Sequence, residues 1–245
     1  MAFLDFEKKS FSAIIFLVAL FCFVPFLGLS NLFDWDEINF AEAAREMLVT
    51  GNYSVVTINY NIFWEKPPLF IWFQALSMKL FGVNEFAARF PNAVAGILTL
   101  QVLFEFGRRY KNQFFGLLWA LTYTGSLLPL FYFKSGIIDP WFNLFMFLSV
   151  MSYLNALHLK LAHKSGATEW FVLAAVTCGL AVMTKGPAAL LLVGGTVGLF
   201  YVLRKFHLPW PSPLQWLLSI FALIVFGGSW FWYEIAIGEY QNIVD

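Results

Sequence analysis

The sequence contains few charged residues. Only 12% of its 245 residues are charged, and its 15 acidic and 15 basic residues cancel. A soluble globular domain carries about 25% charged residues, so the composition excludes an ordinary soluble domain. The zero net charge also argues against a nucleic-acid-binding surface or a polyacidic tail. With 60% hydrophobic residues, the chain has the composition of an integral membrane protein.

Cysteine and histidine are scarce too. The two cysteines, Cys22 and Cys178, both lie in apolar runs, where they are expected to pack as small hydrophobic side chains. The three histidines have no metal-like spacing and are interpreted as solvated loop residues. Disulfide-stapled and zinc-bound folds are therefore disfavoured.

Long apolar runs are plentiful. Each is near the roughly 20 residues that a bilayer requires. The run from Phe11 to Leu29 follows Lys8 and Lys9, is longer than a signal-peptide core and lacks a cleavage pattern, so we interpret it as a retained signal anchor. The predicted membrane spans, about seven, are 11–30, 86–107, 113–132, 140–158, 169–184, 187–203 and 214–234.

Basic residues cluster at alternate joints between these spans. Cytoplasmic loops are enriched in Lys and Arg, so these joints and the N-terminus are predicted to be cytoplasmic. The opposite, outer side then holds 31–85, 133–139, the joint at 185–187 and 235–245. The basic residues are Lys8, Lys9, Arg108, Arg109, Lys111, Lys160, Lys164, Arg204 and Lys205.

The first outer segment, 31–85, is predicted to contain two helices lying in the membrane interface. Asp34 or Asp36 can cap the first, from about Glu37 to Val49, which Gly51 closes. The second begins at Pro67-Pro68 and runs to Leu80, with Gly82 beyond it. A loosely alternating stretch, 53–58, predicts a short extended piece between them.

Carboxylates gather in the outer loops. Asp36 and Glu37 begin the first surface helix, and Asp139 precedes Pro140 at the outer end of the fourth span. Helix capping explains each one separately. Two acids from different loops can also converge on one pocket, as proton acceptance from a hydroxyl requires. We name Asp36, Asp139 and Glu37 as catalytic candidates.

Three outer lysines, Lys66, Lys134 and Lys185, are candidates for binding a lipid phosphate. Lysines near an interface commonly reach toward headgroups, and this alternative stays open for Lys134. Outer lysines run against the positive-inside bias, and Lys185 stands beside a Gly-Pro break. A cluster of such cations suits an anionic ligand.

Glu65 and Glu105 have more local explanations. Glu65 can pair with Lys66 or Arg45, or can ligate a divalent metal ion, although one carboxylate is not a metal site. Glu105 is expected to pair with Arg108 or Arg109 one helical turn later.

Three motifs in the outer segment resemble a known family. They are Asp36–Met47, Phe63–Leu69 and Phe81–Pro91, and Ser135–Asp139 and Thr184–Pro187 extend the match. In order and spacing they resemble the bacterial dolichyl-phosphate-mannose-protein mannosyltransferase-like family, which includes the aminoarabinose transferases that modify lipid A.

The resemblance implies an all-α membrane protein with a GT-C helical bundle. Residues 1–245 would form a single transmembrane module whose first outer loop holds two juxtamembrane helices. Family members have further membrane helices and a soluble outer domain, so we expect this chain to be the N-terminal part of a longer protein. The implied location is the bacterial inner membrane, with the site facing the periplasm.

The resemblance also implies roles for single residues. Asp36 matches the essential acid and Asp139 the second acid. Glu65 matches a position implicated in metal binding, and Lys66 one that touches the lipid phosphate. Where the family usually has Arg-Tyr after the acidic pair, this chain has Asn39-Phe40, so a cation and a hydroxyl are missing.

The implied reaction is inverting transfer of a sugar from a polyprenyl-phosphate donor to lipid A, a glycan or a protein. Lys66 and Lys185 would stabilise the leaving phosphate, and Asp36 or Asp139 would accept the acceptor proton. One alternative is a lipid transporter or flippase, which predicts charges near the bilayer midplane. The other is a non-catalytic membrane subunit that binds polyprenyl lipids, in which the acids would tolerate replacement.

Overall fold

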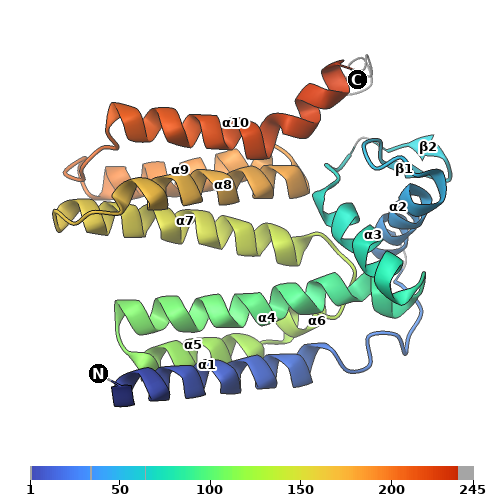
Figure 1. Cartoon of the computed structure of the whole chain (residues 1–245), viewed down its shortest axis with the longest axis horizontal. Helices are drawn as coiled ribbons and strands as arrows, with labels where there is room; N and C mark the ends of the chain where they lie inside the picture. The colour runs from blue at the N-terminus through green and yellow to red at the C-terminus, as the bar shows by residue number, and fades with distance from the viewer. Residues whose placement is uncertain (1, 34, 64, 237–245) are drawn as a thin grey trace. The chain divides into compact units, whose positions relative to one another are not determined.

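The structure, a computed structural model, describes residues 2–33, 35–63 and 65–236 and consists mainly of helices (Figure 1). Its one small sheet, in the described residues, pairs β1 with β2. The elements in chain order are α1 (Ala2–Phe23), α2 (Asp36–Thr50), β1 (Thr57–Ile58), β2 (Asn61–Ile62), α3 (Leu69–Phe81), α4 (Glu85–Tyr110), α5 (Gln113–Thr124), α6 (Leu127–Tyr132), α7 (Asp139–Leu161), α8 (Ala167–Lys185), α9 (Ala188–Leu203) and α10 (Pro213–Ala236).

Several helices have the length and composition of membrane spans. Within the described ranges, four are long and apolar enough to cross a bilayer: α4, α7, α8 and α10. Shorter apolar helical stretches are Phe11–Phe23, Leu69–Phe81 and Ala188–Leu203. The chain is therefore an all-α, multi-pass membrane protein, as its composition predicted.

Two predicted spans differ from the helices observed. The first was expected to reach residue 30, but α1 ends at Phe23 and turns follow it, because Pro25 cannot continue the helix. The span expected at 113–132 is broken at Gly125 and Ser126 into α5 and the short α6. The other five predicted spans coincide with α4, α7, α8, α9 and α10 to within a few residues.

The chain divides into two compact units, and each is described by itself. The N-terminal unit contains Met1–Gly51, Ile58–Tyr60 and Ile71–Pro140. The C-terminal unit contains Asn52–Thr57, Asn61–Phe70 and Trp141–Asp245. A single module over 1–245 remains a prediction.

In the N-terminal unit, α4 packs against α1 and α5. The Ser12 hydroxyl donates to Gln101 Oε1 at 2.8 Å, and Gln101 Nε2 donates to the Ser12 carbonyl at 2.9 Å. Gly107 lets α4 and α5 approach closely, since a Cβ there would lie 2.7 Å from the Cα of Gly116. A polar pair and a glycine contact thus hold the three helices together.

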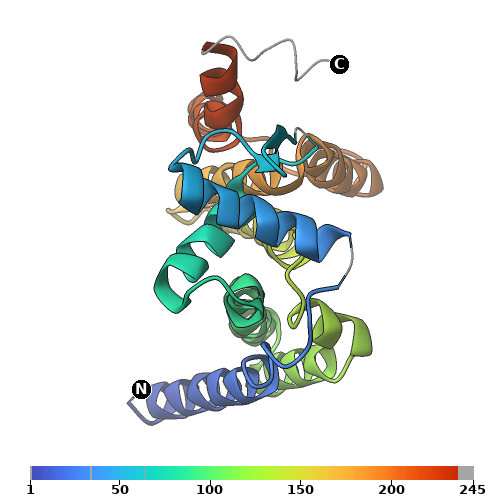
Figure 2. The same cartoon turned by 90° about the vertical axis from the view of Figure 1, so that its right-hand side faces the viewer.

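The helix α2 runs across α4. Figure 2 views α4 nearly along its axis. The predicted glycine stop of α2 is confirmed: Gly51 has φ 71° and donates its N–H to the Met47 carbonyl. The predicted cap is wrong for Asp36, which is the first helical residue, while Trp35 occupies the cap position without a side-chain capping hydrogen bond. Asp34, the other predicted cap, lies outside the described residues.

In the C-terminal unit, α8 packs against both α10 and α9. The contact of α8 with α10 depends on a glycine pair, because a Cβ on Gly179 would lie 2.8 Å from the Gly227 nitrogen. An apolar cavity of about 240 Å³ lies among α7 to α10. Cys178 lines it as a buried free thiol, which agrees with the predicted packing role.

Candidate functional site

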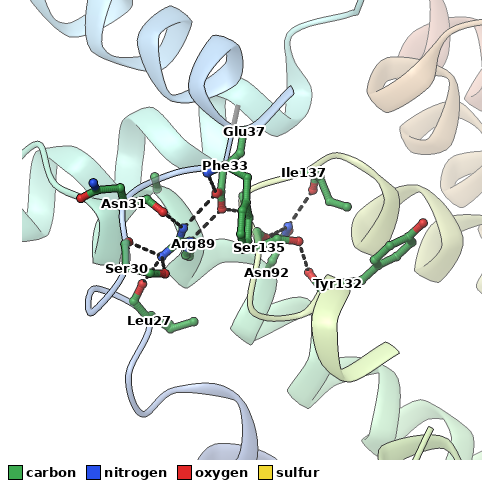
Figure 3. Close-up of polar contacts among 12 residues, drawn as sticks. Leu27, Ser30, Asn31, Phe33, Glu37, Arg89, Asn92, Tyr132, Ser135 and Ile137 are labelled. Carbon is green, nitrogen blue, oxygen red and sulfur yellow. Dashed lines mark hydrogen bonds and ion pairs between the residues drawn. The ribbon is translucent and has the colours of Figure 1, made fainter. Parts of the chain in front are cut away.

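A buried ion pair joins the start of α2 to α4. Glu37 Oε1 accepts a hydrogen bond from Arg89 Nε at 2.8 Å, and Oε2 accepts one from Arg89 Nη2 at 2.9 Å (Figure 3). The two side chains are only 1% and 2% exposed. This two-bond geometry between a planar guanidinium and a carboxylate is the strongest arrangement of such a pair.

Arg89 uses its remaining N–H groups on the segment that follows α1. Nη1 donates to the carbonyls of Leu27 at 2.7 Å and Ser30 at 2.9 Å, and Nη2 donates to the carbonyl of Asn31 at 2.8 Å. A guanidinium has five N–H donors, and these contacts use all of them. Arg89 therefore ties α4 to residues 27–31 as well as to Glu37.

Glu37 is equally fully bonded. Besides Arg89, its Oε2 accepts from the backbone N–H of Phe33 at 2.6 Å, and its Oε1 accepts from that of Gly136 at 2.5 Å. A carboxylate offers about four lone-pair sites, and four donors occupy them. The structure thus places Glu37, predicted as a catalytic acid at the start of a surface helix, in a buried position with four donors on its carboxylate, and its catalytic role stays a prediction.

The loop before α7 is held at the same place. Asn92 Nδ2 donates to the carbonyls of Ser135 at 2.5 Å and Ile137 at 2.6 Å (Figure 3). Gly136 fits beside Ala88 and Glu37 because it lacks a side chain. A Cβ on Gly136 would lie 3.1 Å from the Ala88 carbonyl oxygen and 3.2 Å from Glu37 Cγ. We call Glu37, Arg89, Asn92 and the backbone of 135–137 the buried joint.

The two remaining candidate acids flank the buried joint. Asp36, next to Glu37, is exposed in the first turn of α2. Asp139, two residues after Ile137, is half-buried and begins α7. The loops that contain them, far apart in the sequence, meet at the hydrogen bond between Gly136 and Glu37. Each acid is also the first residue of its helix, Asp36 of α2 and Asp139 of α7.

The three candidate lysines differ in their surroundings. Lys134 donates to the Pro25 carbonyl at 3.2 Å and lies 5.9 Å above the Phe26 ring. Lys66 is half-buried, and its Nζ is 3.9 Å from Glu65 Oε2. Lys185, also half-buried, ends α8 with its Nζ 5.5 Å above the Phe142 ring. Lys134 belongs to the N-terminal unit, whereas Lys66 and Lys185 belong to the C-terminal unit.

The residues present do not make a metal site on their own. The Glu65 side chain is 71% exposed and pairs with Lys66. Arg45, its other predicted partner, pairs with Glu42 at 2.6 Å instead. In the described part of the chain, no group of three His, Cys, Asp or Glu residues could hold a metal ion.

Arg89 and Asn92 were not among the residues singled out from the sequence as candidates for the site, although Arg89 lies in a family motif. An arginine among apolar residues near the start of a predicted span is a signal, because a charge there needs a partner. The predicted local pair is confirmed: Glu105 accepts from Arg108 at 2.8 Å and from Arg109 at 2.7 Å.

Two solved structures have the same fold. The apo structure of ArnT from Cupriavidus metallidurans matches with a TM-score of 0.83 and 21% identity over 96% of this chain and 44% of that chain. The structure of the same protein bound to undecaprenyl phosphate gives a TM-score of 0.76 and 23% identity, over 96% of this chain and 43% of that one. The architecture is thus the GT-C membrane helical bundle that the sequence predicted.

Sequence comparison then identifies the family. The profile of the dolichyl-phosphate-mannose-protein mannosyltransferase family matches residues 65–232, more than half of the chain. The chain belongs to this family.

Curated relatives include two arabinosyl transferases. The undecaprenyl phosphate-alpha-4-amino-4-deoxy-L-arabinose arabinosyl transferase of Shewanella sediminis is 30% identical over 193 residues, 77% of this chain and 34% of the relative. The enzyme of the same name from Serratia proteamaculans is 30% identical over 179 residues, 72% of this chain and 32% of the relative. The chain thus spans about a third of the length of these relatives.

Proposed function

We propose that the protein is an inverting membrane glycosyltransferase. It moves a sugar from a polyprenyl-phosphate donor to an acceptor, with lipid A as the first choice and a glycan or protein as alternatives. One observation supports this most: a chain of this family brings the two loops with Asp36 and Asp139 together at the bond between Glu37 and Gly136. The names of its relatives support the donor class.

In the proposed reaction, an acceptor hydroxyl attacks the anomeric carbon of the sugar. The bond between that carbon and the phosphate oxygen breaks, and the phosphate leaves with the electron pair. Asp36 or Asp139 takes the hydroxyl proton, for which a carboxylate with a free lone pair is needed. Glu37 is left out of the proton transfer because its lone pairs are occupied.

The lysines stabilise the negative charge that develops on the leaving phosphate. Lys66 and Lys185 are the main candidates, because both are half-buried cations and the family resemblance gives Lys66 the position that touches the lipid phosphate. Lys134 is the weaker candidate, since it already donates to the Pro25 carbonyl. A divalent ion at Glu65 stays a prediction, and no step here depends on it.

The proposed setting is the bacterial inner membrane. The N-terminus would be cytoplasmic and the acids and lysines would face the periplasm, following the positive-inside distribution of Lys and Arg. The partners are then the polyprenyl-phosphate sugar, the surrounding lipid and the acceptor.

The direct test uses membranes that contain the full-length protein. Labelled polyprenyl-phosphate sugars are supplied, and label is followed into the lipid, protein and glycan fractions, with Asp36→Asn alongside. We expect label in one fraction and a loss of about a hundredfold or more in the variant, since general-base catalysis contributes that much. Full transfer by Asp36→Asn would remove Asp36 from the mechanism. Binding of the donor without any transfer would favour a lipid-binding subunit.

A further inference from the structure

The buried joint gives the N-terminal unit a feature that the proposed chemistry does not use directly. We propose that Arg89 and Asn92 are positioning residues: through Glu37 and the backbone of 135–137, they hold the helix starts at Asp36 and Asp139 in one fixed arrangement. This inference deepens the proposed function and rests on it, because the acids matter only if transfer occurs.

Arg89 has no N–H group left to bind a ligand. All five N–H groups of Arg89 donate to protein acceptors, and its side chain is 2% exposed. A cation in this state cannot also bind a phosphate without breaking bonds to buried partners. Arg89 therefore acts on the site through other residues.

The buried joint contacts the chain next to both candidate acids. Glu37 directly follows Asp36, and Ile137 precedes Asp139 by two residues. Arg89 and Gly136 hold the first, and Asn92 holds the second. Because Arg89 and Asn92 lie one helical turn apart on α4, a single rigid element supports both acids.

The polar groups of the buried joint fix geometry more than they add stability. Among the described residues, Asn92 Oδ1 accepts no hydrogen bond although Asn92 is fully buried. Leaving a buried acceptor without a donor costs free energy, so the amide is oriented for its two N–H bonds to the loop. A buried ion pair likewise adds little stability over an apolar replacement of similar volume, whereas it fixes geometry.

A matched control distinguishes positioning from mere folding. Glu46 lies on the same helix, is fully buried, and accepts the Tyr60 N–H with its two oxygens at 3.0 and 3.1 Å. Glu46→Gln therefore removes a buried charge of the same kind from α2 at a place that does not hold the acids. We expect Glu46→Gln to lower stability by perturbing a buried acceptor on α2 without moving the acids.

The experiment measures kcat and KM for the donor on folded, full-length protein carrying Glu37→Gln, Asn92→Ala or Glu46→Gln. We expect kcat to fall about a hundredfold in the first two variants with little change in KM, because small displacements of reacting groups cost that much. Glu46→Gln keeps its kcat per folded molecule. Unchanged kcat in Glu37→Gln and Asn92→Ala, or an equal loss in Glu46→Gln, would overturn the proposal.

A second readout needs no activity. Spin labels at Ile38→Cys on α2 and Leu98→Cys on α4, both on exposed positions, report the α2–α4 distance once Cys22 and Cys178 are replaced by serine. We expect a narrow distance distribution that broadens in Glu37→Gln and stays narrow in Glu46→Gln. Suppose that no donor supports transfer, but the distance distribution still broadens in Glu37→Gln and stays narrow in Glu46→Gln. The proposed function is then wrong, and the positioning role of the buried joint is still supported. An unbroadened distribution in Glu37→Gln would count against the joint itself.

Discussion

Both units of this protein bring helices close at glycine contacts, Gly107 with Gly116 in the N-terminal unit and Gly179 with Gly227 in the C-terminal unit, but they differ in what lies beside those contacts. The N-terminal unit buries a charged pair, Glu37 and Arg89, and satisfies every polar group of that pair with protein partners. The C-terminal unit packs through Gly179 and Gly227 around an apolar cavity. The difference teaches that close helix contact needs only small residues, whereas fixing loops 27–33 and 135–137 against α4 uses hydrogen bonds from a buried charged pair and Asn92.

The candidate residues follow this division. The acids Asp36 and Asp139 belong to the N-terminal unit, where the buried joint holds their loops. Lys66 and Lys185 belong to the C-terminal unit, where Lys185 lies above an aromatic ring. A proton acceptor needs a precise position, whereas a flexible lysine can follow a phosphate as its charge develops.

The largest expected effect comes from exchanging one cation in each unit for methionine. Arg89→Met leaves Glu37 buried without its charge partner and should destabilise the fold by about 3–5 kcal/mol. Lys185→Met removes a partly exposed cation above a ring, so stability should change by less than about 1 kcal/mol while transfer is lost. Thermal unfolding in detergent, followed by size-exclusion chromatography, measures the first effect, and the transfer assay measures the second. Equal stability losses would contradict the comparison.

A medium effect is expected at the glycine contact of the C-terminal unit. Gly179→Val places atoms where a Cβ alone would lie 2.8 Å from the Gly227 nitrogen, so α8 and α10 must separate at a cost of about 1–3 kcal/mol. Gly194→Ala on α9 is the control, because a Cβ there meets nothing within 4 Å. The thermal midpoint should fall for the first variant and hold or rise for the second. A fall of similar size in both would show that helix flexibility, rather than close contact, explains the glycines.

The smallest effect is expected for the surface pair on α2. The hydrogen bond from Arg45 lowers the pKa of Glu42 below its ordinary value of 4.5. A lowered folded-state pKa contributes stability above pH 4.5 that disappears as pH falls through the folded value. Both side chains are partly exposed, so the contribution is less than about 1 kcal/mol. The midpoint difference between wild type and Glu42→Gln should shrink on acidification; a constant difference would mean that packing, not charge, is responsible.

Local features of the fold were predictable because they depend on neighbours in the sequence. The stop of α2 at Gly51 follows from a residue that tolerates positive φ, and the Glu105 pair follows from helical spacing. The break between α5 and α6 was missed, since Gly125 lies within an otherwise apolar run. The predicted cap of α2 was wrong for Asp36, because the helix already begins at that residue.

The amino-acid sequence by itself determined the class of the protein: a membrane bundle of apolar helices with acids and lysines in the segments between them. The length of apolar runs, the distribution of Lys and Arg, and short motifs depend on residues that are close together in the sequence. They can therefore be recognised without a structure. Only the tertiary structure decided which of two adjacent acids is exposed and which is buried. Glu37 and Asp36 are adjacent and alike in sequence, yet contacts 52 and 99 residues away bury one of them. Such long-range bonds depend on how helices meet, and no local pattern specifies that.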